Sequence, residues 1–231
     1  MATPTLENDI FEQLSTEETT AQFILTPINQ IQVYDTNGNL QETINSVTVT
    51  YSNGKLEVKG EFTSTESYTI GYIAIGSYYG GVFKQYFVDK SLNGQSVKSS
   101  NLYEITSTVT LNTIKLLLSP FTSATVNVSK LVNIIGSILA GNPVETGKSG
   151  ALFSGIYIIN TTSNVAQSYR IPVSIITIQN GVLLIGGIAS NTVSGNQIVL
   201  RDSAETTLIS VTGISPITIK AGRQVIFELS F

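Results

Sequence analysis

Apolar and polar residues alternate along much of this chain with the two-residue period of β-strands. Residues 47–51 are Val-Thr-Val-Thr-Tyr, and residues 56–62 are Leu-Glu-Val-Lys-Gly-Glu-Phe. An Asn-Gly pair at 53–54 separates the two segments. Asn-Gly between alternating segments is the strongest short-range signal for a β-hairpin, because both turn residues adopt positive φ. The pattern therefore predicts a hairpin over 47–62.

The same hairpin signal occurs a second time. Segments 49–60 and 176–187 align without a gap over their full length. They share five identical pairs, namely Thr50/Thr177, Asn53/Asn180, Gly54/Gly181, Leu56/Leu183 and Gly60/Gly187. The repeat favours two β units in tandem, each built around one hairpin. The alternative is chance recurrence of Asn-Gly turns in a β-rich chain.

Short strands separated by turn residues fill both halves of the chain. In the first half we predict strands at 22–25, 31–34, 47–51, 56–62, 68–75, 82–88 and 103–111. In the second half we predict them at 152–159, 165–170, 173–178, 182–188, 197–201, 207–211, 217–220 and 225–231. Such spacing is typical of β-sandwiches and jelly rolls. We therefore expect an all-β fold with two tandem sandwich or jelly-roll domains, at 21–113 and 149–231.

A connecting segment at 114–148 has a different pattern. Strands are expected near 113–118 and 125–128, and a helix is expected over 129–140, with Ser129 as its N-cap and Gly141 after its end. Its apolar face consists of Leu131, Ile134, Ile135, Ile138 and Leu139. A buried strand pair broken at Gly136 is the alternative. The helix either packs on a sandwich or joins helices of other subunits, so that Leu131, Ile134, Ile135 and Ile138 are candidate interface residues.

The N-terminal arm, residues 1–20, is acidic. Segment 1–23 has no Lys or Arg, and its net charge of −5 comes from Glu7, Asp9, Glu12, Glu17 and Glu18. The rest of the chain has 12 basic and 11 acidic residues and a net charge of +1. The arm is either a mobile tail or a segment that docks on a neighbouring subunit through Ile10, Phe11 and Leu14.

Composition excludes several kinds of chemistry. The 231 residues include no Cys and no His, so disulfides, thiol nucleophiles and a Ser-His-Asp triad are impossible. We expect no enzyme activity, no cofactor and no metal site. The near-neutral body argues against nucleic-acid binding, which needs a basic surface. No signal peptide is visible and no apolar run reaches the 18 residues of a spanning helix, so we expect no direct membrane span.

Four features of the sequence resemble functional sites, and each also has a simpler interpretation. Glu57 and Glu61 share a strand face and resemble a glycosidase pair, but Lys55 and Lys59 lie on the same face and favour a solvated surface. Segment 141–149 contains glycines and a Lys-Ser pair but has the wrong spacing for a phosphate loop.

Tyr78 and Tyr79, beside Gly80-Gly81, are the aromatic residues of segment 68–87 that we expect to be exposed and to contact a ligand or partner. Most other aromatic residues of this segment are expected in the core. Asn127 and Asn160 match the acceptor pattern for N-glycosylation, a pattern that arises readily in an Asn- and Thr-rich chain.

The C-terminal stretch carries a resemblance to a known class of proteins. It consists of Gln-Ile-Val-Leu-Arg-Asp at 197–202, Ser-Pro-Ile-Thr-Ile-Lys-Ala-Gly at 215–222 and Val-Ile-Phe-Glu-Leu-Ser-Phe at 225–231. It resembles the end of β-sandwich modules in viral tail and spike proteins. The composition, rich in Thr, Ile and Asn and only 12% charged, is similar to that of virion proteins from crenarchaeal viruses.

This resemblance implies a structural protein of the virion, such as a tail, nozzle or turret component. Such a protein would form homo-oligomers and bind other virion proteins through strand edges and apolar faces. The alternative is an adhesin module that binds glycans on a host cell surface.

Overall fold

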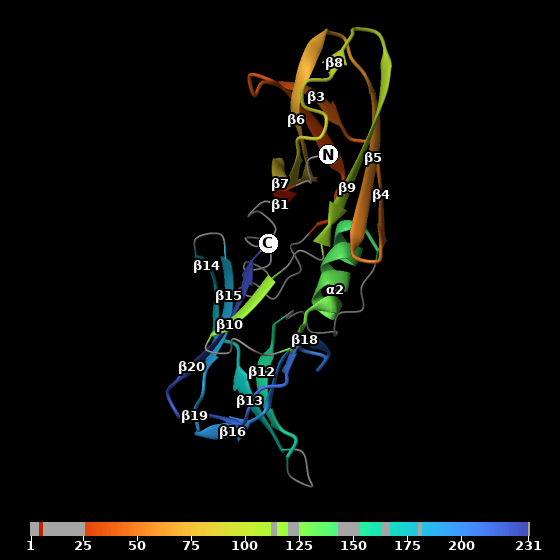
Figure 1. The fold of residues 1–231 in the computed structure, drawn as a ribbon. Coiled ribbons are helices and arrows are strands. Elements are labelled where there is room, and N and C mark those ends of the chain that lie inside the picture. Colours follow the sequence, from red (N-terminus) through yellow and green to blue (C-terminus); the bar gives the residue numbers. More distant parts are fainter. Residues whose placement is uncertain are drawn as a thin grey trace. The chain divides into compact units, whose positions relative to one another are not determined.

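The computed structural model describes residues 5–6, 26–111, 115–119, 125–142, 153–162, 167–179 and 182–230 (Figure 1). The fold is mostly β, with 61% of the described residues in strands. Antiparallel sheets form two halves, and a short helix lies between them in the chain. The predicted all-β class with two tandem β-sandwich units is therefore confirmed.

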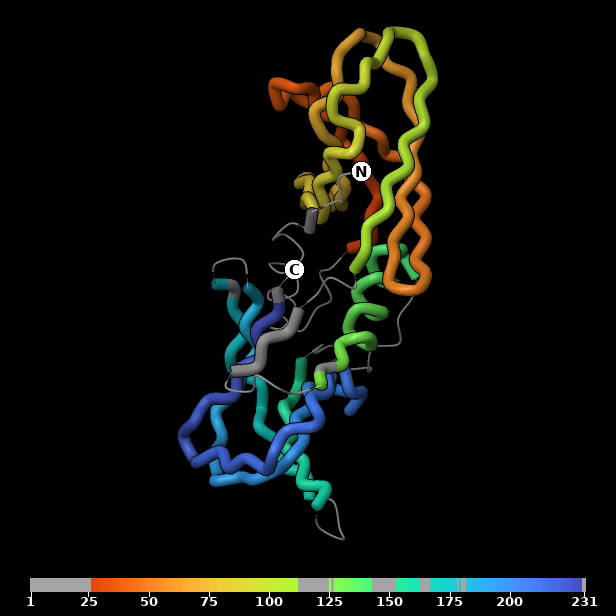
Figure 2. Tube along the Cα trace, viewed as in Figure 1, coloured from red at the N-terminus to blue at the C-terminus, as the bar shows by residue number. Residues whose placement is uncertain are grey.

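The first unit contains two sheets. One follows the order β1 (Thr5–Leu6), β7 (Val82–Asp89), β6 (Tyr68–Tyr79), β2 (Gln30–Asp35) and β3 (Leu40–Ile44), and β8 (Ser96–Val97) also pairs with β6. The other follows the order β4 (Val47–Ser52), β5 (Lys55–Thr63) and β9 (Leu102–Thr110). Figure 2 traces this unit from red to yellow-green.

The second unit also contains two main sheets. One follows the order β11 (Thr125–Asn127), β18 (Thr207–Thr212), β17 (Gln197–Arg201), β12 (Gly155–Asn160) and β13 (Gln167–Pro172). The other follows the order β14 (Ile175–Gln179), β15 (Val182–Ile188), β20 (Gln224–Ser230) and β10 (Lys115–Ser119). A small ladder joins β16 (Val193–Gly195) to β19 (Ile217–Ile219).

The two units have the same strand order. The order β1-β7-β6-β2-β3 corresponds to β11-β18-β17-β12-β13, and β4-β5-β9 corresponds to β14-β15-β20. The long strand β6 matches β16 and β17 together, and β8 on β6 matches β19 on β16. The predicted repeat is thus present in the topology. One strand of the second unit, β10, has no counterpart among the described strands of the first.

The hairpin that signalled this repeat forms as predicted. β4 and β5 pair in register from Val47↔Gly60 to Ser52↔Lys55. Asn53 has a φ of 51° and Gly54 a φ of 75°, the left-handed values that a two-residue hairpin turn needs. In the second unit β14 and β15 pair up to Gln179↔Val182. The turn residues there, 180–181, lie outside the described residues.

Segment 114–148 supplies strands to the second unit. β10 pairs with β20, and β11 pairs with β18, its partner more than eighty positions later in the sequence. The helix that follows, α2 (Ser129–Leu139), is divided between the two compact units at Ile134 and Ile135. Local patterns predicted these elements but contained no information on their partners.

The ends of α2 are capped by identifiable groups. Asn127, rather than the predicted Ser129, provides the N-terminal cap, because its Oδ1 accepts bonds from the Ser129 N–H and hydroxyl at 3.0 and 2.6 Å. At the other end Asn142 N–H donates to the Ser137 carbonyl, and Gly141 has a φ of 74°. This is a Schellman ending, which requires a left-handed residue after the helix.

Alternating burial places one face of each strand in a core. Along β5 the side chains of Leu56, Val58 and Phe62 are buried, while Lys55 and Lys59 are exposed. β2 similarly buries Ile31 and Val33. In the second unit the buried residues include Ile156 and Ile158 of β12, Ile198 and Leu200 of β17, and Phe227 and Leu229 of β20. Each unit thus has its own apolar interior.

Candidate functional site

Among the described residues of the first unit, exposed large apolar side chains gather at the end of the β6–β7 hairpin. Exposed fractions are 50% for Tyr78, 71% for Tyr79 and 53% for Val82. Tyr79 pairs directly with Val82, and the turn between them is Gly80-Gly81, with φ of 60° and 84°. The predicted exposure of Tyr78 and Tyr79 is therefore confirmed, and we call Tyr78–Val82 the hairpin tip.

Hydrogen bonds fix the base of this tip. Tyr78 N–H donates to Asn29 Oδ1 at 2.7 Å, and Asn29 Nδ2 donates to the Tyr78 carbonyl at 3.1 Å. The buried Ser77 hydroxyl accepts a hydrogen bond from the Thr26 hydroxyl at 2.7 Å. The Thr26 hydroxyl also forms a hydrogen bond with Tyr86 Oη at 3.0 Å. The tip is therefore presented from a rigid base, which lowers the entropy cost of binding a partner.

The neighbouring aromatic residues serve the fold. Tyr86 and Phe87 are fully buried and meet edge to face. Tyr72 stacks on Tyr34 with ring centres 4.6 Å apart. The expectation that most other aromatic residues of segment 68–87 lie in the core is met only by Tyr86 and Phe87, because Tyr68, Tyr72 and Phe83 are half-buried.

The outer face of the β4-β5-β9 sheet holds the carboxylates that resembled a glycosidase pair. Glu57 forms an ion pair with Lys59 at 2.9 Å, as expected for a solvated face. Glu61 lies directly opposite Glu104 of β9. An open depression of about 580 Å³, lined in part by Lys59, Glu61, Leu102 and Glu104, lies on this face.

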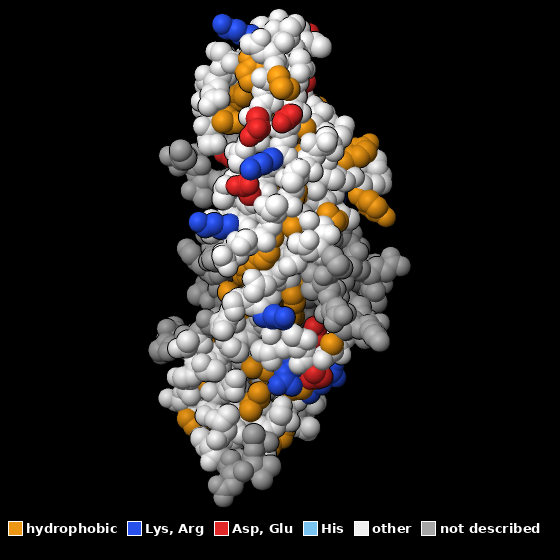
Figure 3. Space-filling view, turned by 90° about the vertical axis from the view of Figure 1, so that its right-hand side faces the viewer, with side chains coloured by type: hydrophobic (Ala, Val, Ile, Leu, Met, Phe, Trp, Pro, Cys, Tyr) orange, Lys and Arg blue, Asp and Glu red, His pale blue; other side chains and the backbone are white. Residues whose placement is uncertain are grey.

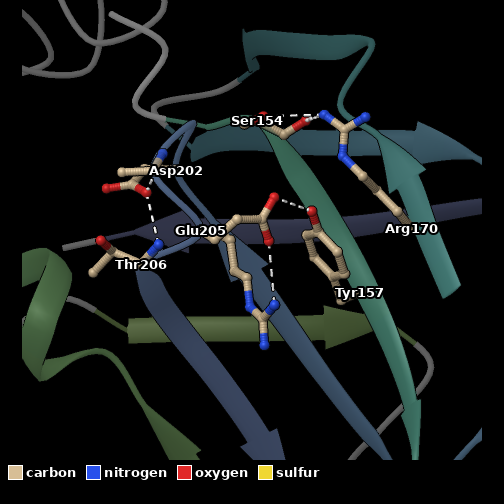
Figure 4. Close-up of polar contacts among 8 residues, drawn as sticks. Ser154, Tyr157, Arg170, Asp202, Glu205 and Thr206 are labelled. Atoms are coloured by element: carbon tan, nitrogen blue, oxygen red, sulfur yellow. Dashed lines mark hydrogen bonds and ion pairs between the residues drawn. The ribbon is translucent and has the colours of Figure 1, made fainter. Parts of the chain in front are cut away.

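A second polar cluster lies in the second unit and was not predicted. Tyr157 of β12 donates from its hydroxyl to Glu205 Oε1 at 2.5 Å, and Arg201 of β17 donates to Glu205 Oε2 at 3.2 Å (Figure 4). The Arg201 guanidinium lies 4.6 Å from the centre of the Tyr157 ring. Arg170 of β13 donates to the carbonyl and hydroxyl of Ser154, both at 3.1 Å.

Gly155 makes room for this cluster. A Cβ at position 155 would lie 2.9 Å from both Arg170 Nε and the Tyr157 ring. Two polar atoms nearby, Arg201 Nε and Ser203 Oγ, are buried without a hydrogen-bond partner. Glu205 itself has a φ of 64°, which is uncommon for a residue with a side chain. The loop Asp202–Thr206 is held by the buried Asp202, whose Oδ1 accepts bonds from Ala204 N–H and Thr206 N–H.

The electrostatics of the cluster favour a fixed charge network. The hydrogen bond from Tyr157, followed by the Arg201 contacts, lowers the pKa of Glu205. Partial burial, followed by the bond to Glu205, raises the pKa of Tyr157. A carboxyl group that acts as a general acid needs a raised pKa, and a tyrosine that acts as a base needs a lowered pKa. Here the pKa of Glu205 is lowered and that of Tyr157 is raised, so the arrangement suits binding or stability better than proton transfer.

Sequence reasoning had one usable signal for this cluster. All three arginines of the chain, Arg170, Arg201 and Arg223, lie in its second half. The sequence did not show that Arg170 and Arg201 lie near Tyr157, because these three residues come from three strands that pair only in the folded sheet.

The predicted interface residues of α2 are mostly inside the chain. Leu131, Ile134 and Ile135 are at most 4% exposed, and Ile138 alone keeps partial exposure. In this structure they contribute to the chain's own packing. Ile10, Phe11 and Leu14 of the acidic arm lie outside the described residues, as does most of segment 141–149.

The two glycosylation-type asparagines share one local geometry. Asn127 Oδ1 accepts bonds from Ser129, and Asn160 Oδ1 accepts bonds from Thr162 N–H and Oγ1 at 3.0 and 2.6 Å. Both side chains thus cap turns of their own backbone.

Across the described parts of the chain, no group of three or more acidic residues is placed to hold a metal ion. Within the same residues, no helix is long and apolar enough to cross a membrane. In comparisons with known proteins, no family model, no curated protein and no solved structure matches this chain.

Proposed function

We propose that this chain is a structural protein of a virion appendage, such as a tail, nozzle or turret, and that it assembles with copies of itself and with other virion proteins. It acts by forming contacts and not by catalysis. The hairpin tip is the observation that carries the proposal, because three large apolar side chains project from a hydrogen-bonded base. Rigid, exposed aromatic residues are typical anchors of protein interfaces.

Low charge supports the same function. Only 12% of residues are charged, and the face shown in Figure 3 carries scattered charged side chains on a largely uncharged surface. Burying charge at an interface is costly unless each group is paired. A sparsely charged surface therefore suits a protein that covers much of itself with neighbouring subunits.

The test is the oligomeric state of the purified chain in solution. Sedimentation velocity should show concentration-dependent association of the wild-type chain. The double variant Tyr79→Ser/Val82→Ser should weaken that association at least tenfold. Ile188→Ser is the matched control, because Ile188 is similarly exposed, at 49%, on a strand of the other unit. A wild-type chain that stays monomeric at all concentrations would contradict the proposal.

A glycan-binding adhesin is the second candidate, and the exposed rings of Tyr78 and Tyr79 at the tip favour it. Tyrosine rings stack on the apolar faces of sugars, and these two residues, on successive strand positions, present one ring on each face of the hairpin. A glycan array separates the candidates. The adhesin function requires a sugar signal that is lost in Tyr78→Ala, whereas the structural function requires none.

A further inference from the structure

Two carboxylates of the β5–β9 depression have no counter-ion among the described residues. Glu61 and Glu104 lie directly opposite each other on the two strands, and both are exposed. Lys59, two positions before Glu61 on the same face, is ion-paired with Glu57 at 2.9 Å. Glu104 accepts a long hydrogen bond of 3.4 Å from the Thr106 hydroxyl, which leaves its charge uncompensated. Like charges directly opposite each other destabilise a sheet, so this pair favours a cation supplied from outside the chain.

An exposed leucine lies beside these carboxylates. Leu102 is 69% exposed and precedes Glu104 by two positions on β9, so the two side chains lie on one face of the strand. The exposed Thr63 of β5 is the cross-strand partner of Leu102. This surface therefore presents a row that contains a leucine and, one two-residue step along the strand, an acidic row. We call Glu61, Thr63, Leu102 and Glu104 the acidic patch.

One face of the β6–β7 hairpin has the complementary pattern. Tyr79 pairs with Val82, and Lys84 follows Val82 by two positions on β7, so the three side chains share one face. Tyr79 and Val82 are both exposed. Lys84 is half-buried and forms no ion pair with any residue that the structure describes. This face thus presents an apolar row and, one two-residue step along the strand, a cation.

We propose that this hairpin face, from Tyr79 and Val82 to Lys84, docks on the acidic patch of a second copy. Two residues along a strand span about 7 Å on either surface, so Lys84 reaches the carboxylate pair when the apolar row lies on Leu102. The hairpin and the patch belong to different sheets of the first unit. A contact between two different surfaces is heterologous, and its repetition builds rings or filaments. The inference rests on the proposed self-association and identifies both of its surfaces.

Charge reversal on either surface tests this contact. Lys84→Glu gives the hairpin face a negative charge, and Glu61→Lys/Glu104→Lys gives the patch a positive charge. Each variant alone places like charges face to face and should associate at least tenfold more weakly than the wild type in sedimentation velocity. Mixed in equal amounts, the two variants should form particles again, because each hairpin then meets a patch of opposite charge on the other variant.

The design separates a specific contact from general charge repulsion. Lys84→Glu makes the chain more acidic than the wild type, and the double variant makes it less acidic, yet both are expected to associate more weakly. Lys220→Glu is the matched control for Lys84→Glu, because Lys220 is an exposed lysine of the other unit. It should associate like the wild type. A loss as large as that of Lys84→Glu would overturn the inference.

A milder variant guards against a failure to fold. Glu104→Lys alone places a lysine directly opposite Glu61, so the sheet gains a cross-strand ion pair while the patch loses its net negative charge. This variant should also weaken association at least tenfold. Wild-type association of Glu104→Lys would contradict a role for the patch, whatever the double variant does.

The outcomes distinguish this inference from the proposed function. If Tyr79→Ser/Val82→Ser dissociates the particles while Lys84→Glu and Glu104→Lys associate like the wild type, the acidic patch is not the contact and self-association stands. If the charge variants dissociate and mixing them restores no particles, the two surfaces do not meet and the inference is wrong. A wild type that is monomeric at all concentrations overturns both proposals.

Discussion

The ring of Tyr51 occupies the space that a side chain at Gly136 would need. A Cβ at position 136 would lie 2.2–2.5 Å from ring atoms of Tyr51. This contact joins the first hairpin to α2 and explains a glycine in the middle of a helix, where glycine costs about 1 kcal/mol relative to alanine. Close approach of the two elements outweighs helix propensity at this position.

Gly136→Ala should therefore destabilise the protein in spite of the better helix former. We expect a net loss of about 1–2 kcal/mol in the free energy of unfolding, because the methyl group overpacks against the ring. In a Tyr51→Ala background the same substitution should become neutral or stabilising. Urea unfolding of the four proteins of this cycle measures the coupling. Equal effects of Gly136→Ala in both backgrounds would contradict the contact.

The hairpin turn gives a second prediction. Gly54 is buried and has a φ of 75°, so Gly54→Ala forces a side chain into the left-handed region and should cost about 1–2 kcal/mol. Asn53→Gly should be nearly neutral, since glycine adopts the φ of 51° at that position freely. Thermal unfolding of both variants tests the pair, and a neutral Gly54→Ala would argue against the turn geometry.

Local signals predicted local structure in this chain. The hairpin at 47–62 and the helix near 129–140 follow from turn chemistry and spacing within a dozen residues, and both are present. The predicted position of the helix N-cap was wrong by two residues. Asn and Ser are both good N-cap residues, and only the folded backbone shows that Asn127, not Ser129, is used.

Long-range partners could not be predicted. The pairing of β10 with β20 and the meeting of Tyr157 with Glu205 join residues far apart in sequence. No periodicity encodes such distances in one sequence. The repeat at 176–187 was the only long-range signal, and it led to the correct tandem architecture because each unit keeps its hairpin at the same place in its strand order.

A buried acid gives a third prediction. Asp89, 3% exposed at the end of β7, accepts bonds from the Ser107 hydroxyl of β9 at 2.5 Å and from Ser91 N–H at 2.7 Å. Ser107→Ala removes one partner of a buried carboxylate and should cost about 1–3 kcal/mol. Thr106→Ala, an exposed neighbour, should change stability by less than about 0.5 kcal/mol. Similar unfolding midpoints for the two variants would contradict the role of this bond.

The link between Tyr157 and Glu205 predicts a dependence on pH. The hydrogen bond from Tyr157 lowers the pKa of Glu205, so the folded state binds the carboxylate's proton less tightly than the unfolded state. The stability from this shift is fully present above the unfolded-state pKa of about 4.3 and is lost as the pH falls through the lower folded-state value. Glu205→Gln should thus melt below the wild type at pH 7, and the two melting curves should converge in acid.

Tyr157→Phe separates this effect from a general loss of packing. It removes the donated proton but keeps the ring under Arg201, so it should reproduce the pH-dependent part of the Glu205→Gln effect. Tyr169→Phe is the control, because the Tyr169 hydroxyl donates to Gln167 and not to an acid. Melting temperatures of the wild type and the three variants, measured from pH 2 to pH 7, test this prediction. A gap between wild type and Glu205→Gln that stays constant over this range would show that the carboxylate's charge is not what Tyr157 and Arg201 stabilise.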